Sequence, residues 1–184
     1  MPFVEKFREY WRTNWKSHAR TLTLFVTIMV CVQAWQTRDV PSGLAPNFEL
    51  VILQPDGTTR ASTLQEWRAL HPGQPVALHF WADWCPICRT EENSITRLSK
   101  DWNVLTVARQ SGPIANVQKV LLQRRLSWNT GVDESGGATD AYGFSAVPAF
   151  VVVDAQGQLR ASTVGYTTEI GMRLRLWWAS LVNA

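Results

Sequence analysis

Short apolar runs alternate with mixed segments along most of this chain. Val76–Trp81, Val104–Ala108 and Ala149–Val153 are nearly all apolar, which is typical of strands buried on both faces of a sheet. Between them, Pro86–Trp102 and Ile114–Leu126 have the patterning of helices. Further expected elements are a strand over Phe48–Leu53, helices over Ser62–Leu70 and Thr168–Leu181, and a strand over Leu159–Thr163 that closes a hairpin. The alternation predicts an α/β fold with a mixed sheet.

Local signals set the expected boundaries. Ser62 and Gln65 have the spacing of a capping box at a helix start. Pro55-Asp56-Gly57 predicts a turn. Gly131–Tyr142 is rich in Gly and Asp, so we expect a loop or a short helix there.

The N-terminal part reads as a membrane segment. Thr21–Thr37 contains no charged residue, and its apolar part, Leu22–Trp35, is short, because a span usually needs about 20 residues. Basic residues before it favour a cytoplasmic N-terminus. The expected organisation is a basic tail (1–20), a transmembrane anchor (21–37), a linker (38–47) and a domain (48–184).

A cleavable signal peptide is the competing interpretation of this segment. Val32-Gln33-Ala34 places a bulky valine where a small residue is expected, and Val30 makes a poor lipoprotein site at Cys31. We therefore favour an uncleaved, single-pass anchor, with the C-terminal domain facing the periplasm or the outside.

Charge is concentrated in that tail. The chain has a net charge of +3 from 18 basic and 15 acidic residues, and six of the basic ones but only two acidic ones lie within residues 1–38. The body is therefore slightly acidic and has no nucleic-acid footprint. One compact domain without a spare apolar helix predicts a monomer.

The chemistry is concentrated in Trp84-Cys85-Pro86-Ile87-Cys88, where an apolar run meets a predicted helix. A sulfur near a helix N-terminus is favoured as thiolate, which makes Cys85 the expected nucleophile. Cys88, one turn on, can attack the mixed disulfide that forms. Pro86 suits a first helical turn, and Trp84 supplies an apolar wall. This chemistry needs no organic cofactor.

Two other uses of the pair are weighed against exchange. A zinc site needs two further ligands, and the remaining candidates, Cys31, His18, His71 and His79, show no ligand-like pairing. No metal site is therefore expected. A structural disulfide is also conceivable, but an exported domain with only these two cysteines has no disulfide framework.

At this point the chain resembles the thioredoxin fold, and most closely the membrane-anchored thiol–disulfide oxidoreductases of the TlpA/ResA/CcmG type. The resemblance rests on Ala45–Phe48 before the first strand, Phe80–Arg89 around the cysteines, Glu91, and Ala146–Phe150. It covers roughly residues 45–181. The Cys-Pro-x-Cys pair with a short body suggests the suppressor of copper sensitivity D subgroup.

The resemblance implies residue roles. Cys85 attacks and Cys88 resolves; Pro148 forms a cis bond beside the dithiol, and Val147 offers backbone groups to a substrate strand. Glu91 moves protons. Without the resemblance, Pro148 would be read as a strand-entry proline, and Glu91 as a solvated helix-surface residue, as we expect of Glu92.

His79 departs from the family pattern. Thioredoxins have an aspartate there, and many TlpA-type proteins an asparagine. A buried histidine could relay a proton. The simpler interpretation, which we favour, is a core histidine bonded to a backbone carbonyl.

The leading hypothesis is therefore a protein dithiol–disulfide oxidoreductase that is anchored in a bacterial inner membrane by a single span, with its C-terminal domain in the periplasm. The resemblance implies reduction of substrate proteins, in copper stress or cytochrome c maturation, with electrons from a DsbD-type membrane reductase. The alternative is a copper-handling protein that uses both thiolates as soft ligands. A peroxidase would want a Pro/Thr-lined cysteine pocket, which the run before Cys85 lacks.

Overall fold

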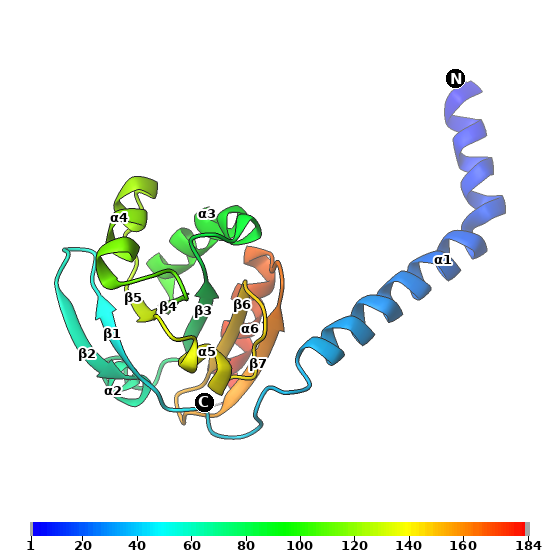
Figure 1. The fold of residues 1–184 in the computed structure, drawn as a ribbon. Coiled ribbons are helices and arrows are strands. Elements are labelled where there is room, and N and C mark those ends of the chain that lie inside the picture. The colour runs from blue at the N-terminus through cyan, green and yellow to red at the C-terminus, as the bar shows by residue number, and fades with distance from the viewer. Residues whose placement is uncertain (1, 183–184) are drawn as a thin grey trace. The chain divides into compact units, whose positions relative to one another are not determined.

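The sheet at the centre of the domain has seven strands in the order β2-β1-β5-β4-β3-β6-β7. The computed structural model describes residues 2–182. The strands are β1 (Glu49–Leu53), β2 (Thr59–Thr63), β3 (Val76–Trp81), β4 (Asn103–Arg109), β5 (Thr130–Asp133), β6 (Ala149–Val153) and β7 (Leu159–Val164). β4 runs parallel to β3 and β5, whereas β6 runs antiparallel to β3 and β7 (Figure 1). The predicted mixed sheet is confirmed.

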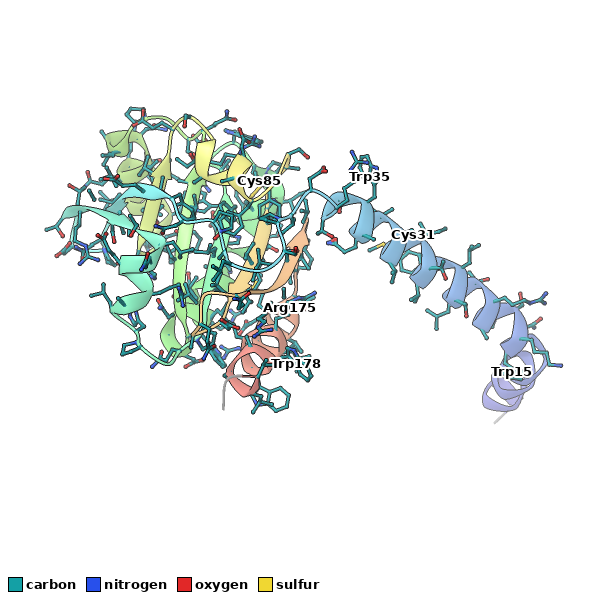
Figure 2. All side chains as sticks on the ribbon, turned by 90° about the horizontal axis from the view of Figure 1, so that it is seen from below. Trp15, Cys31, Trp35, Cys85, Arg175 and Trp178 are labelled. Carbon is teal, nitrogen blue, oxygen red and sulfur yellow. A yellow bond between two sulfur atoms is a disulfide. The ribbon has the colours of Figure 1, made fainter. Side chains whose placement is uncertain are left out.

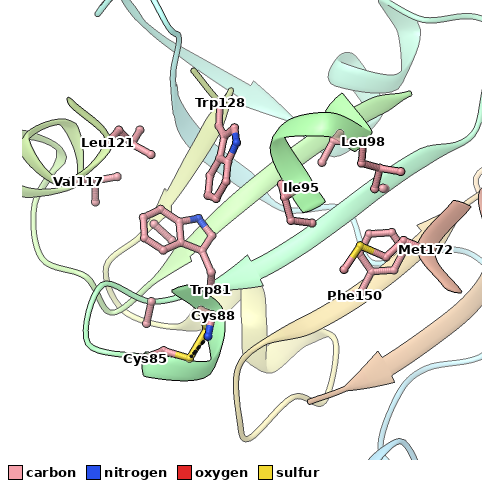
Figure 3. Packing of buried hydrophobic residues seen from close by; sticks show 14 of the residues in the cluster. Trp81, Cys85, Cys88, Ile95, Leu98, Val117, Leu121, Trp128, Phe150 and Met172 are labelled. Atoms are coloured by element: carbon pink, nitrogen blue, oxygen red, sulfur yellow. Dashed lines mark hydrogen bonds between the residues drawn. A yellow bond between two sulfur atoms is a disulfide. The ribbon is translucent and has the colours of Figure 1, made fainter. Parts of the chain in front are cut away.

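Helices cover both faces of this sheet. They are α2 (Leu64–Ala69), α3 (Pro86–Asp101), α4 (Ile114–Arg124), α5 (Gly137–Ala141) and α6 (Glu169–Leu181). Alternate residues of the central strands point to opposite faces. One face packs against α3, α4 and α6, and Figure 3 shows Trp81, Trp128 and Phe150 among side chains of these helices. The other face packs against α2 and the aromatic residues that follow α5.

Three local predictions fail for identifiable reasons. Strand β2 was not expected, because its sequence, TRAST, is almost wholly polar. Strand β5 was not expected either, because it contains Gly131 and glycine is uncommon in strands. Glycine is needed at this position, since a Cβ there would lie 2.6 Å from the Leu50 side chain. The capping box before α2 is formed by Thr63 and Glu66, one residue later than the predicted pair.

The N-terminal helix α1 (Pro2–Gln36) forms a unit separate from the domain that begins at Thr37. Apolar side chains between Leu22 and Trp35 are exposed on it. Among residues 2–182, no helix combines the length and the apolar character that crossing a membrane requires. The transmembrane helix expected over 21–37 is thus not supported, because its apolar part is shorter than a usual span.

Candidate active site

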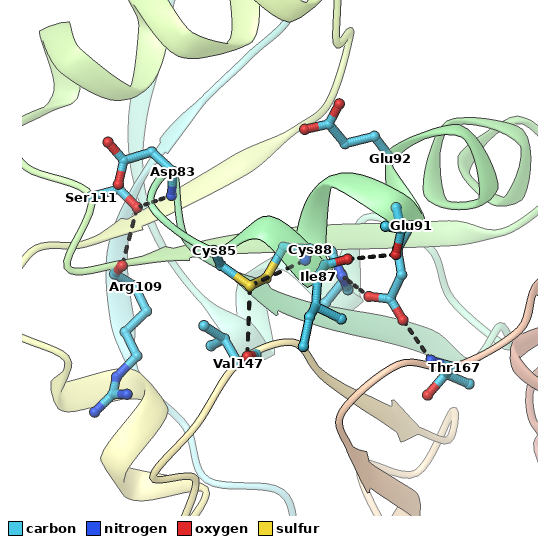
Figure 4. The surroundings of a disulfide bond; sticks show 12 residues. Asp83, Cys85, Ile87, Cys88, Glu91, Glu92, Arg109, Ser111, Val147 and Thr167 are labelled. Carbon is cyan, nitrogen blue, oxygen red and sulfur yellow. Dashed lines mark hydrogen bonds and ion pairs between the residues drawn. A yellow bond between two sulfur atoms is a disulfide. The ribbon is translucent and has the colours of Figure 1, made fainter.

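Cys85 and Cys88 form a disulfide where β3 leads into α3 (Figure 4). Cys85 is the N-cap of α3 and has an extended backbone, and the helix begins at Pro86. The backbone N–H of Cys88 donates to the Cys85 Sγ atom at 3.1 Å. This sulfur therefore occupies the place where a helix N-terminus stabilises negative charge.

The disulfide is buried, but its surroundings are open. Cys85 is 3 % exposed, whereas Trp84 and Ile87 on either side are 58 % and 50 % exposed. The indole N–H of Trp84 donates to the Gln110 carbonyl at 3.3 Å, which holds the ring in place. Pro86 is exposed as well. Exposed apolar side chains thus form a rim beside the buried Cys85 sulfur.

The loop before β6 completes this rim. The peptide bond between Val147 and Pro148 is cis. The Val147 carbonyl oxygen lies 3.7 Å from the Cys85 Sγ atom. The structure therefore brings Val147, 62 positions away in the sequence, to the Cys85 sulfur, as the resemblance implied for the Val147–Pro148 loop.

Glu91 lies one turn beyond Cys88, on the buried face of α3, and is 1 % exposed. Its Oε2 atom is 3.1 Å from His79 Nε2, and its Oε1 atom accepts the Thr167 backbone N–H at 2.6 Å. The alternative interpretation of Glu91, a solvated residue on the helix surface, is therefore wrong. The favoured interpretation of His79, a bond to a backbone carbonyl, is wrong for Nε2, since its partner is a carboxylate on the neighbouring helix.

The hydrogen bonds limit where the proton of this pair can lie. Two polar atoms at 3.1 Å in a buried site need one proton between them. Within the part of the chain that the structure describes, His79 Nδ1 is buried without a partner. A proton there would be an unsatisfied donor, so the geometry favours a neutral imidazole that donates from Nε2 to the Glu91 carboxylate.

A second set of contacts holds the loop that precedes Cys85. The backbone N–H of Asp83 donates to Ser111 Oγ at 3.0 Å, and its carbonyl accepts from Arg124 Nη2 at 2.9 Å. Arg124 also donates to Glu92 Oε1 at 2.8 Å. Glu92, expected to be solvated, is instead half-buried in an ion pair. We call Ser111 and Arg124 the Asp83 clamp.

The sequence offered no signal for this clamp. Both residues lie in or near α4, and neither belongs to a recognisable motif. Both anchor Asp83 by its backbone, so the identity of Asp83 is not informative either. By contrast, the cysteine pair and the Val147–Pro148 bond, which the sequence did single out, meet at the Cys85 sulfur.

Among residues 14–182, whose side chains the structure describes, no group of three or more His, Cys, Asp or Glu side chains is arranged to hold a metal ion.

Comparison with known proteins agrees with this arrangement. A model of the AhpC/TSA family matches residues 42–162, which is well over half of the chain. The chain belongs to this family. The recognition of a thioredoxin-like protein from the sequence is therefore confirmed.

Curated relatives within this family carry names that specify the chemistry. The chain is 30 % identical over 134 residues to the thiol:disulfide interchange protein DsbE of Allochromatium vinosum, which covers 70 % of this chain and 71 % of that one. It is also 30 % identical over 112 residues to a thioredoxin-like protein of Haemophilus influenzae, covering 60 % and 66 % of the two chains. ResA of Geobacillus thermodenitrificans is 26 % identical over 136 residues, covering 72 % of this chain and 74 % of ResA. The enzyme class expected from the sequence is the one these names carry.

Solved structures share the fold. StoA of Bacillus subtilis superposes with a TM-score of 0.56 at 19 % identity, covering 75 % of this chain and 99 % of StoA. A thiol:disulfide interchange protein of Chlorobium tepidum superposes with a TM-score of 0.60 at 21 % identity, covering 77 % and 99 %. The family member described here therefore has the thioredoxin-like α/β fold.

Proposed function

We propose that this protein is an exported protein dithiol–disulfide oxidoreductase that reduces disulfides in other proteins through Cys85 and Cys88. The observation that carries the proposal is the position of the Cys85 sulfur. It caps α3, accepts the Cys88 N–H at 3.1 Å, and lies 3.7 Å from an open backbone carbonyl in the Val147–Pro148 loop. A structural disulfide would have no need of such a setting.

The reaction is two exchanges. The Cys85 thiolate of the reduced protein attacks one sulfur of a substrate disulfide, and the other substrate sulfur leaves as a thiolate that takes up a proton. The Cys88 thiol then loses its proton and attacks the Cys85 sulfur. The bond between Cys85 and the substrate breaks, the second substrate thiol leaves, and two electrons have passed from this protein to the substrate. An external dithiol protein must reduce the Cys85–Cys88 disulfide again.

The rim explains how a protein substrate is held during the first exchange. Trp84 and Ile87 offer apolar surface on one side of the sulfur. Val147 offers a backbone carbonyl on the other. An extended substrate segment bonded to that backbone would present its disulfide to Cys85, with little dependence on its side chains.

Glu91 and His79 serve the second exchange. Cys88 must give up a proton when it attacks, and its side chain is buried away from water that could accept the proton. The Glu91 carboxylate lies one helical turn away and is already bonded to His79 and to the Thr167 N–H. We assign Glu91 as the proton acceptor and His79 as the positioning residue that holds its carboxylate toward α3.

The N-terminal helix supports attachment to a membrane from the periplasmic side. Its apolar side chains between Leu22 and Trp35 are exposed, and basic residues precede them. Such a surface is stable only when something covers it. With this attachment, a DsbD-type membrane reductase is the proposed electron donor, and apocytochromes or copper-stress proteins are the proposed substrates.

Trapping of substrate proteins tests the exchange most simply. In Cys88→Ser the second exchange cannot occur, so Cys85 should hold partners as mixed disulfides that dithiothreitol releases. Cys85→Ser should trap none, although it retains one thiol of the pair. If both variants trapped partners equally, or if both lost only tight Cu(I) binding, the exchange mechanism would be wrong and the copper-handling alternative would gain support.

A further inference from the structure

The outer face of α6 carries large apolar side chains that nothing in the domain covers. They are Ile170, Leu174, Trp177, Trp178 and Leu181, with exposed fractions from 48 % to 72 %. With 3.6 residues per turn they fall within an arc of about 100°. We call these five residues the α6 stripe. A single exposed leucine needs no explanation, but a contiguous stripe with two tryptophans does.

The stripe is not the core-facing side of the helix. Met172, Leu176 and Ala179 are fully buried against the sheet, on the opposite face of α6. The helix is therefore apolar on two faces. A helix of this kind is normally buried all round, so the outward face needs a second apolar partner.

Arginines flank the stripe on both sides. By helical position, Arg173 and Arg175 lie on opposite edges of the stripe. Arg173 pairs with Glu169, the one acidic residue in α6, and with Asp101, so its charge is matched within the domain. Arg175 instead donates to the Gly171 carbonyl and forms no ion pair among the described residues. Arg175 therefore leaves one positive charge beside the stripe, which favours an anionic surface as the partner.

We propose that the α6 stripe docks the domain onto the surface of an anionic membrane. Apolar and tryptophan side chains would enter the boundary between headgroups and acyl chains, and Arg175 would reach a lipid phosphate. This inference rests on the proposed membrane attachment, because only a tethered domain meets a lipid surface at high local concentration.

The location of the stripe is compatible with exchange. Figure 2 shows Trp178 and Cys85 on opposite sides of the domain. Docking through α6 would therefore leave the disulfide, Trp84 and the Val147 carbonyl facing away from the lipid. Protein substrates would approach from the aqueous side while the domain is held at the membrane.

A nitroxide label in the stripe tests the proposal on the full-length chain. Leu174→Cys is labelled in a Cys31→Ser background while the Cys85–Cys88 pair stays oxidised, and the protein is added to vesicles of phosphatidylethanolamine and phosphatidylglycerol. Lys119→Cys, on exposed α4, is the matched control. We expect the label at 174 to collide more with oxygen than with a water-soluble nickel complex, and the label at 119 to show the reverse.

The other outcomes each overturn a different statement. If the chain floats with vesicles but the 174 label collides mainly with the nickel complex, the stripe does not dock on lipid, while the membrane attachment stands. If the label is shielded from both reagents, or couples to a second label, the occupant is protein, either another copy or α1. If the chain does not float at all, the attachment and the docking both fail, while insulin reduction by the same sample still reports on the exchange.

A double substitution keeps the test independent of one labelled site. Trp177→Gln with Trp178→Gln removes the largest part of the stripe from exposed positions, so the fold should persist. In this variant the 174 label should move toward the accessibility of the 119 label. An unchanged 174 label would contradict the proposal.

Discussion

Glu91 Oε2 and His79 Nε2 lie 3.1 Å apart, and each side chain is only 1 % exposed. A carboxylate in such a place is costly unless it is hydrogen-bonded, and here it has two donors, His79 and the Thr167 N–H. The pair joins β3 to α3 one helical turn from Cys88. It is the feature of this protein that most directly links its core to its chemistry.

The first prediction concerns the proton acceptor. Glu91→Gln keeps an oxygen for the Thr167 N–H but cannot accept a proton, so turnover in dithiothreitol-driven insulin reduction should fall by about 10²-fold. The loss should shrink as pH rises, because hydroxide then deprotonates Cys88 without help. Glu134→Gln, an exposed carboxylate, is the control and should leave the rate unchanged. Equal rates for the two variants would remove Glu91 from the mechanism.

The second prediction concerns the stability of the same pair. His79→Leu leaves the Glu91 carboxylate buried with one donor fewer, and this lost hydrogen bond to a charged group should cost about 1.5 to 3 kcal/mol in urea unfolding of the oxidised protein. The double variant His79→Leu with Glu91→Met should recover much of this loss, because no buried charge remains. Additive losses in the double variant would show that the two groups are not coupled.

The third prediction concerns the Asp83 clamp. Arg124→Met removes the donor to the Asp83 carbonyl and leaves Glu92 unpaired. We expect a loss of about 1.5 to 3 kcal/mol of stability, together with slower exchange because the loop before Cys85 is less ordered. Arg125→Met, at the exposed neighbouring position, removes the same charge and should change neither property. If the two substitutions had equal effects, the loss would come from the change in net charge and not from the contacts of Arg124.

The fourth prediction concerns the end of α4. Arg125 is the C-cap of this helix, with φ of 56° and ψ of 43°, a left-handed conformation that side chains adopt at a cost. Arg125→Gly should therefore raise the free energy of unfolding by about 0.5 to 1 kcal/mol. The urea midpoint is the measurement, and a lower midpoint would contradict the expectation.

The fifth prediction concerns acid sensitivity near α6. Hydrogen bonds from Arg97 and then Arg173 lower the pKa of Glu169 below its ordinary value of 4.5. A lowered pKa in the folded state stabilises the protein above pH 4.5, and this contribution is lost as pH falls through the lower, folded value. Glu169→Gln should therefore be less stable than the parent at pH 7, and the difference should vanish in strong acid. A difference that stays constant between pH 7 and pH 2 would contradict this account.

Sequence patterns were sufficient for the architecture because the central strands are apolar on both faces. In an α/β domain, short and nearly all-apolar runs such as Val76–Trp81 and Ala149–Val153 are typical of buried central strands. The edge strand β2 was missed because its polar residues carry no such signal. Its existence depends on pairing with β1, which is a tertiary effect.

The sequence predicted those parts of the site that are marked by short local motifs. The cysteine pair is recognisable from its Cys-x-x-Cys spacing, and the resemblance to a known family singled out Pro148 and Glu91. The hydrogen bond between His79 and Glu91 could not be predicted from the sequence, because it depends on how α3 packs against β3. The role of Arg124 could not be predicted for the same reason, since it donates to a backbone carbonyl 41 residues away in the sequence.

The measurement that tests the central claim most directly is the reduction potential of the Cys85–Cys88 pair in the full-length protein. The chain would be equilibrated in dithiothreitol buffers of known potential and its free thiols counted. A protein that reduces others should have a value near that of thioredoxin, about −270 mV. A value near about −120 mV would make it an oxidant, and would contradict both the direction of exchange and the electron donor proposed here.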